Sequence, residues 1–328
     1  MSADRLHVAI LDDYEGLAAG VSSFEKLKAR ADVVVVRERL ATDNDLERAL
    51  KNLHVVLLMR ERTRFGEKQL ALAPALKLIS QTGRSIAHLD LPAATRRGVA
   101  VSVTPNDSGS STIELTVGLI LAVLRQIPQV DRRMRQEAWP AIAGRLLEGK
   151  TLGVVGLGRI GTQVSRIVKA FNARVLATAR TLTDERARAV GAERVSLETL
   201  LRESDVVTIH VPLRPETRGL IGEKEIALMK PGAVLINTAR GAIVSEAALI
   251  RALQDGRLGG AGLDVFDEEP LPLDHPLRRL DNAVLLSHRG YAAVEILTER
   301  YELAIGNILN FIDGQPTNLL NPEVFKGG

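Results

Sequence analysis

Short apolar runs alternate with amphipathic stretches along the first hundred residues of the chain. The apolar runs predict strands, and the stretches between them, with apolar residues three or four positions apart, predict helices. Because such alternation builds parallel sheets through right-handed crossovers, the pattern predicts an α/β fold. The predicted strands are Leu6–Leu11, Asp32–Val36, His54–Met59, Leu76–Ser80 and Val99–Val103, and the helices include Val21–Ala29, Asp43–Lys51 and Asp90–Arg97.

The alternation resumes after a hinge and a long helical pattern. Turn-forming residues at Thr104–Gly109 indicate the hinge, and one long helix is predicted over Ser111–Glu137. A last helix, Val294–Phe311, is too short to form a domain, so we expect it to return to the first sheet. The predicted domains are residues 1–104 with 292–328, and residues 105–291. Strands of the second domain are predicted at Thr151–Val155, Arg174–Thr178, Asp205–His210, Ala233–Asn237, Gly260–Val265 and Ala283–Ser287, and its first helix at Gln163–Phe171.

Size and composition agree with this division. A chain of 328 residues exceeds the usual size of a single core. Hydrophobic residues make up 45% and charged residues 25%, an ordinary globular balance. A net charge of +3 predicts neither nucleic-acid nor membrane binding. The absence of cysteine excludes disulfides and thiolate catalysis. With no secretory or membrane-spanning apolar run, we expect a cytoplasmic protein.

A glycine-rich turn, Gly156-Leu157-Gly158-Arg159-Ile160-Gly161, lies between a predicted strand and a helical pattern. An ordinary tight turn could use the same glycines, but this context is typical of a dinucleotide site. Gly156 permits the sharp turn, Gly158 lets a pyrophosphate approach, and Gly161 lets the helix pack on the strand. The free N–H groups at the start of the helix would face the phosphates.

Three residues at predicted strand ends have the chemistry that a bound nicotinamide requires. Arg240 offers a guanidinium for a substrate carboxylate. His288 offers an imidazole that exchanges protons near neutral pH. Glu269, the last of three consecutive acids that the residues alone do not distinguish, offers a carboxylate that would orient the imidazole and favour its charged form. Each has a structural alternative, as a loop arginine, a hydrogen-bonded histidine or an acidic loop. Because ligands bind outside the carboxyl ends of parallel strands, we expect the three to converge.

Together these segments resemble the D-isomer-specific 2-hydroxyacid dehydrogenases over nearly the whole chain. The resemblance rests on an ordered series: the glycine turn, His210-Val211-Pro212-Leu213-Arg214-Pro215-Glu216-Thr217, Met229-Lys230-Pro231-Gly232, Asn237-Thr238-Ala239-Arg240-Gly241, and Gly262-Leu263-Asp264-Val265-Phe266 ending in Glu269-Pro270.

The resemblance implies a Rossmann cofactor domain inserted into a flavodoxin-like substrate domain, a homodimer formed through the cofactor domain, and no metal. It implies hydride transfer between NAD(P)H and a small anionic 2-oxo acid, with D-2-hydroxy acid as the reduced form. Arg240 would bind substrate, Glu269 would orient His288, His288 would transfer the proton, and Asp264 would bind the carboxamide. Cofactor contacts are expected from Gly156, Gly158, Arg159, Ile160, Gly161, Ala179, Arg180, His210, Val211, Pro212, Thr217, Thr238, Ala239, Asp264 and Gly290.

The chain departs from the family after the second Rossmann strand, where NAD-specific members carry an acidic residue. Ala179 stands there, followed by Arg180. Because no carboxylate remains to repel a 2′-phosphate and Arg180 could bind one, we expect NADP(H) to be preferred. The alternative is an exposed Arg180 and an enzyme that still uses NAD(H).

A second departure concerns the substrate. The family's Gly-x-Gly-x-Asp stretch corresponds to Gly83-Arg84-Ser85-Ile86-Ala87 followed by His88-Leu89-Asp90. Backbone around Gly83 is expected to hold the substrate carboxylate, and Arg84 either adds charge or faces solvent. With Arg60 and Arg240, this suggests an anionic, even dianionic, substrate. Trp139, the only tryptophan, is expected to pack.

Several functions stay open within this reading. A phosphoglycerate dehydrogenase, a glyoxylate or hydroxypyruvate reductase and a general D-2-hydroxyacid dehydrogenase all fit the motifs. The chain ends soon after the last helix, without the regulatory domain of some phosphoglycerate dehydrogenases, and Ala179 favours the reductases. From another class, an NAD(P)-sensing binding protein or corepressor would retain the same residues, although the chain has no long disordered tails for partners.

Overall fold

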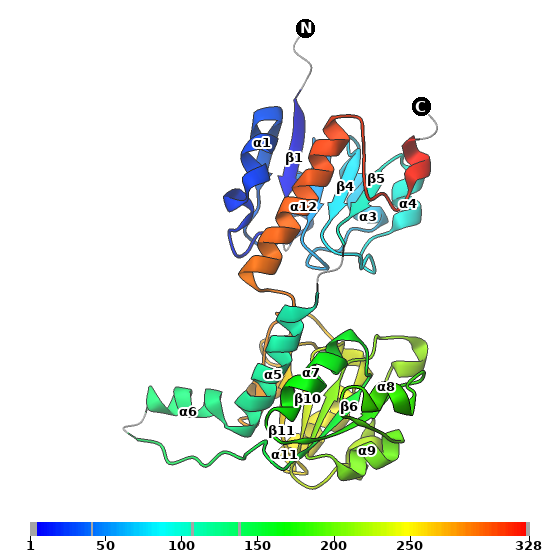
Figure 1. Ribbon diagram of the computed structural model, residues 1–328. Coiled ribbons are helices and arrows are strands. Elements are labelled where there is room, and N and C mark those ends of the chain that lie inside the picture. Colours follow the sequence, from blue (N-terminus) through cyan, green and yellow to red (C-terminus); the bar gives the residue numbers. More distant parts are fainter. Residues whose placement is uncertain (1–4, 41, 106–107, 137–138, 326–328) are drawn as a thin grey trace. The chain divides into compact units, whose positions relative to one another are not determined.

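The structure is a computed structural model that describes residues 5–40, 42–105, 108–136 and 139–325. The chain divides into two compact units (Figure 1). The first unit is Met1–Ser108 with Ala292–Gly328, and the second is Gly109–Tyr291. Both are built on parallel sheets covered by helices, which confirms the predicted fold class.

The first unit has a five-stranded parallel sheet in the order β2-β1-β3-β4-β5. This is the flavodoxin-like order. After β2 the chain crosses back over β1, so that β3 pairs with the other side of β1. The last three strands are buried along their whole length, as expected for parallel strands covered on both faces. The strands are β1 Leu6–Ile10, β2 Ala31–Val35, β3 Val55–Leu58, β4 Leu78–Gln81 and β5 Ala100–Val103.

Helices of the first unit form two groups of neighbours. One group is α1 (Ser22–Arg30) with α12 (Val294–Ile312), and α12 also packs on β4. The other group is α2 (Asp43–Leu50), α3 (Glu67–Leu72) and α4 (Leu91–Arg96). The second group buries its apolar residues in one cluster with alternate residues of the strands, since alternate side chains share a sheet face.

The second unit has a seven-stranded parallel sheet in the order β12-β11-β10-β9-β6-β7-β8. Counted from β6, this is the Rossmann order with one extra strand at the edge. Every predicted strand is present within two residues of its predicted bounds. The strands are β6 Thr151–Val155, β7 Arg174–Thr178, β8 Glu193–Arg194, β9 Val206–Ile209, β10 Ala233–Asn237, β11 Leu258–Leu263 and β12 Ala283–Leu285.

The long helix predicted over Ser111–Glu137 was wrong. Two helices occupy this stretch, α5 (Ser110–Leu124) and α6 (Ile127–Met134), and Glu137 lies outside the described residues. Gln126 has a left-handed φ of 53°, and Pro128 follows in the first turn of α6. Proline lacks an N–H and clashes with the carbonyl four residues earlier, so α5 cannot continue through it.

Within the described residues, no single helix has the length and hydropathy of a membrane span; α5 and α6 together do, but a 64° bend separates them.

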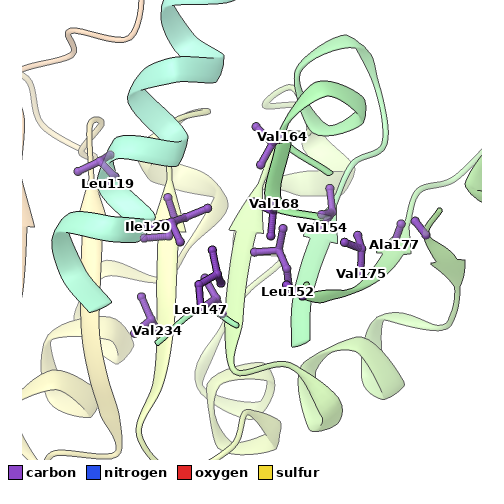
Figure 2. Packing of buried hydrophobic residues seen from close by; sticks show 14 of the residues in the cluster. Leu119, Ile120, Leu147, Leu152, Val154, Val164, Val168, Val175, Ala177 and Val234 are labelled. Carbon is purple, nitrogen blue, oxygen red and sulfur yellow. The ribbon is translucent and has the colours of Figure 1, made fainter. Parts of the chain in front are cut away.

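Two helices cover one face of the sheet of the second unit. Leu119 and Ile120 of α5 lie over β10 and β11, and Val164 of α7 (Arg159–Lys169) lies over Leu152 and Val154 of β6 (Figure 2). The helix α7 begins directly after Gly158, four residues earlier than predicted. The remaining helices are α7 Arg159–Lys169, α8 Asp184–Arg188, α9 Leu197–Glu203, α10 Glu223–Leu228 and α11 Glu246–Gln254. Short 3-10 turns lie at Ala18–Gly20, Pro215–Thr217, Gly241–Ile243, Pro276–Arg279 and Pro322–Phe325.

Candidate active site

The loop that presents Arg240 is held by the last residue of β10. Asn237 is buried, and its Oδ1 accepts a hydrogen bond from the Ala239 N–H at 3.0 Å. Its Nδ2 donates to the Arg240 carbonyl at 2.9 Å. One amide therefore sets the course of the backbone on either side of Ala239. Asn237 has no reactive chemistry that would mark it as a site residue in the sequence, although its position at the end of a buried strand was a usable signal.

A glycine brings the loops after β10 and β11 into contact. A Cβ on Gly241 would overlap the backbone carbonyl of Phe266. The N–H of Phe266 in turn donates to Oε1 of Glu269 at 2.9 Å. Gly241 belongs to the family motif, and its role in the structure is to allow the close approach of the two loops.

Glu269 and His288 form the central pair of the second unit. His288 Nδ1 lies 2.7 Å from Glu269 Oε2, and about a third of each side chain is exposed. Burial alone would raise the pKa of Glu269. The hydrogen bond and charge of His288, the Phe266 N–H and the charge of Arg240 outweigh burial and lower that pKa. The carboxylate is therefore ionised near neutral pH and accepts a hydrogen bond from Nδ1–H of the ring.

His288 follows β12 in a loop that is fixed from two sides, and its φ is 55°. Asp264 is buried at the end of β11 and accepts hydrogen bonds from the N–H groups of Arg289 at 2.6 Å and Gly290 at 2.7 Å. The Gly290 carbonyl accepts from Thr112 Oγ1 at 2.8 Å. Burial raises the pKa of Asp264, and the two backbone N–H groups oppose that rise. Asp264 thus holds the His288 loop in place. The resemblance in sequence did not predict this role.

The glycine turn has the geometry of a phosphate cradle. Gly156 has a φ of 105°, and a Cβ there would lie 2.7 Å from the carbonyl carbon of His210. A Cβ on Gly161 would overlap the Gly156 carbonyl, whereas one on Gly158 would meet no described atom within 4 Å. Arg159 and Ile160 are the first residues of α7. A helix start that opens beside an uncrowded glycine fits a dinucleotide phosphate.

The residues after β7 lie beside this turn. The Gly156 N–H donates to the Thr178 carbonyl at 2.8 Å, so Ala179 directly follows the contact. Ala179 packs partly buried against the apolar core, and Arg180 is exposed. Arg180 is therefore exposed, two positions after the backbone contact of Thr178 with the cradle.

The loop after β9 faces Gly156 and is internally bonded. His210 Nε2 lies 3.0 Å from Thr208 Oγ1, and burial lowers the pKa of His210 to about 4. A Cβ on Gly156 would also lie 2.9 Å from Cγ1 of Val211. Thr217 Oγ1 donates to the Pro212 carbonyl at 2.7 Å and so closes the loop.

Thr238 contacts the first turns of α5. Its hydroxyl lies 3.0 Å from that of Thr116, and both are buried. The same helix therefore fixes the Arg240 loop through Thr116 and the His288 loop through Thr112.

In the first unit, Arg60 and Gly83 lie together at the carboxyl ends of β3 and β4. Arg60 has a φ of 56°, and a Cβ on Gly83 would lie 2.5 Å from Arg60 Nη1. The Gly83 N–H donates to Thr104 Oγ1 at 2.7 Å. Because Gly83 has no side chain, it leaves the space that the Arg60 guanidinium occupies. Arg84 is exposed.

Among the described residues, no group of three or more histidine or acidic side chains could hold a metal ion. Trp139, expected to pack, is 83% exposed within the chain.

Comparison with known proteins gives a consistent result. The family model for the NAD-binding domain of D-isomer specific 2-hydroxyacid dehydrogenases matches residues 117–290. A glyoxylate reductase of Aeropyrum pernix is 43% identical over 78% of this chain and 80% of its own length. A D-3-phosphoglycerate dehydrogenase of Archaeoglobus fulgidus is 38% identical over 79% of this chain, which spans 50% of that relative. A phosphoglycerate oxidoreductase structure from Vibrio cholerae superposes with a TM-score of 0.89 at 31% identity, covering 94% of this chain and 99% of the other.

Proposed function

Because the chain belongs to the D-isomer-specific 2-hydroxyacid dehydrogenase family, we propose that it transfers hydride between a nicotinamide cofactor and a 2-oxo acid, whose reduced form is the D-2-hydroxy acid. One observation carries the proposal: a carboxylate and an imidazole are hydrogen-bonded at the carboxyl edge of the Rossmann sheet, where such sheets bind their ligands.

His288 is the proton-transferring residue in this proposal. Its Nδ1 hydrogen is directed to the ionised Glu269, which leaves Nε2 to exchange a proton with the substrate oxygen. Glu269 stabilises the positive charge on the ring in the protonated form. Its other oxygen is anchored on the Phe266 N–H, so the pair keeps its geometry while the proton moves.

Arg240 is the proposed anchor for the substrate carboxylate. A guanidinium binds a carboxylate with two parallel hydrogen bonds and can also polarise an adjacent carbonyl. Its charge is felt at Glu269, whose pKa it helps to lower. We assign Arg60 and the backbone around Gly83, whose own N–H is bonded to Thr104, to substrate binding in the first unit; the exposed Arg84 has weaker support.

A bound nicotinamide dinucleotide supplies the hydride. The cradle around Gly156 and the start of α7 would hold its pyrophosphate, and the loop from His210 to Pro212 lies against that cradle. We propose a preference for NADP(H) over NAD(H), since Ala179 removes the acidic residue and Arg180 is exposed beside the turn.

The substrate is proposed to be a small 2-oxo acid such as glyoxylate or hydroxypyruvate. The glyoxylate reductase of Aeropyrum pernix is more similar to this chain, at 43% identity, than the phosphoglycerate dehydrogenase of Archaeoglobus fulgidus, at 38%. A reductase is therefore the better-supported member of the family.

We propose that the protein is a homodimer formed through the second unit. Figure 1 shows α6 extending away from the sheet of the second unit. Large apolar residues are exposed on α6, Ile127 and Met134, and beyond it, Trp139 and Leu146. Such a surface is typical of a protein interface, and light scattering after size exclusion would give the mass. The cytoplasmic location expected from the sequence stays a prediction.

The direct test is an oxidation assay of NADPH and NADH with a panel of 2-oxo acids. We expect turnover with glyoxylate or hydroxypyruvate and D-stereochemistry in the product. Tight cofactor binding without turnover on any oxo acid would instead favour an NAD(P)-sensing binding protein.

A further inference from the structure

The substrate-binding edge of the first unit is organised by a buried amide. Gln81 is the last residue of β4 and has no exposed surface. Its Nε2 donates to the Arg60 carbonyl at 3.0 Å and to the Thr82 carbonyl at 2.9 Å. Both hydrogens of the amide are used, and they join the ends of β3 and β4.

His88 fixes which way this amide points. His88 Nε2 lies 3.2 Å from Gln81 Oε1, which can only accept a hydrogen bond, so Nε2 carries the hydrogen. Burial lowers the pKa of His88 to about 4, with Arg60 adding to that effect and Glu61 opposing it. The ring is therefore neutral near pH 7, and it donates to the oxygen of the amide.

The clamped segment includes a residue in an unfavourable backbone conformation. Arg60 has a φ of 56°, a region that side-chain-bearing residues occupy only when their surroundings require it. Its N–H donates to Thr82 Oγ1 at 2.8 Å while its carbonyl accepts from Gln81. The backbone of Arg60 is thus held at both polar groups.

This conformation directs the Arg60 side chain over Gly83. Nη1 of Arg60 lies 2.5 Å from where a Gly83 Cβ would be, and the Gly83 N–H is held by Thr104. The position of the Arg60 guanidinium is therefore coupled to the backbone at residue 83, because any side chain there would collide with the guanidinium.

We propose that Gln81 is a positioning residue for substrate binding: its amide, oriented by His88, holds Arg60 and the Gly83 loop in the arrangement that receives an anionic substrate. This inference rests on the proposed function, in which Arg60 binds the substrate. Gln81 itself does not touch the reacting atoms.

The test is steady-state kinetics of Gln81→Leu with glyoxylate at saturating NADPH. Leucine fills a similar volume but releases both carbonyls. We expect KM for glyoxylate to rise about tenfold, the effect of losing a net interaction typical of a buried hydrogen bond. We expect kcat and the Kd of NADPH to stay within about twofold, because the proposed cofactor contacts in the second unit are unchanged.

Asn321→Leu is the matched control. Asn321 is also a buried amide of the first unit, and it clamps the Val101 N–H at 2.8 Å and the Val99 carbonyl at 2.9 Å. It lies at the opposite end of β5 from Thr104. A loss of stability without a change in KM is expected, which separates positioning from general destabilisation.

Two further measurements make the inference decisive. In an Arg60→Ala background, the effect of Gln81→Leu on KM should vanish, because the two residues act as a unit. If Gln81→Leu does not fold, His88→Phe should raise KM while His88→Gln, which keeps a donor, should restore it.

An unchanged KM in folded Gln81→Leu, or an undiminished effect in the Arg60→Ala background, would overturn the inference. If Arg60→Ala alone leaves KM unchanged, the positioning role falls with the binding role of Arg60. Oxo-acid turnover by the same protein would still support the proposed reductase, so the two failures are distinguishable.

Discussion

Glu269 Oε2 and His288 Nδ1 lie 2.7 Å apart, although nineteen positions of chain separate the two residues. The second carboxylate oxygen is held by the Phe266 N–H at 2.9 Å. A carboxylate bonded on both sides keeps the ring in one tautomer and one orientation. This pair is the geometric basis of the proposed proton transfer.

Replacing His288 by alanine should remove most of the turnover. A positioned general acid or base contributes on the order of 10²–10⁴ in rate, so we expect kcat for glyoxylate reduction to fall by about that factor. NADPH binding, measured by fluorescence titration, should persist. His275→Ala is a matched control, since His275 also bonds a glutamate, Glu246, at 3.0 Å. Full activity in His288→Ala would exclude it as the proton donor.

Replacing Glu269 by glutamine should change the pH dependence of reduction. The amide can still contact the ring, but it cannot stabilise the positive charge of the protonated imidazole. Reduction needs that protonated form, so the variant should lose rate at a lower pH than the unaltered enzyme, with KM for NADPH little changed. Superimposable pH–rate profiles would show that the charge of Glu269 is not used.

The residues after β7 should determine the choice of cofactor. Arg180→Ala should lower kcat/KM for NADPH about tenfold, as expected for the loss of a charge-assisted contact to phosphate. Ala179→Asp should favour NADH, because a carboxylate repels the 2′-phosphate and bonds the ribose hydroxyls. A clear preference of the unaltered protein for NADH would contradict the NADP assignment.

Gly241 should not tolerate a side chain. A methyl group there would overlap the Phe266 carbonyl, forcing the loop after β11 and its Glu269 out of place. We expect Gly241→Ala to lower kcat at least about tenfold and to lower Tm. Gly118→Ala is the control: Gly118 is exposed within α5 with nothing within 4 Å, and alanine there should stabilise the helix by about 1 kcal/mol.

Stability should fall in mild acid because the half-buried His210 resists protonation in the folded chain. The pKa of His210 is lowered from its ordinary 6.5 to about 4. Between these pH values the unfolded chain binds a proton that the folded chain does not, so the free energy of unfolding decreases as pH falls through this window. The full effect is at most about 3 kcal/mol, reached near pH 4.

Denaturant unfolding at pH 7.5 and pH 4.5 would measure this difference. In His210→Gln the gap between the two pH values should shrink. The same substitution at the half-exposed His7 is the control and should leave the gap as it is. An equal gap in His210→Gln and the unaltered protein would show that His210 titrates normally.

The order of apolar and polar segments was enough to predict two parallel α/β sheets, since alternation of strand and helix leaves few other arrangements. The motif residues Arg240, Glu269 and His288 were also identifiable, through resemblance. What the pattern could not show was the break after Leu124. An apolar periodicity runs through it, whereas a left-handed Gln126 and Pro128 end the helix locally.

The carboxylate beside the imidazole was decided by tertiary structure. Asp267, Glu268 and Glu269 are consecutive, and nothing in their order distinguishes them. Only the folded loop, brought close by Gly241, directs Glu269 to both the Phe266 N–H and His288. The clamp of Gln81 on Arg60 arises in the same way. Sequence determines which elements form because that depends on neighbouring residues; hydrogen bonds between strand ends depend on pairing across the sheet, which only the packed chain defines.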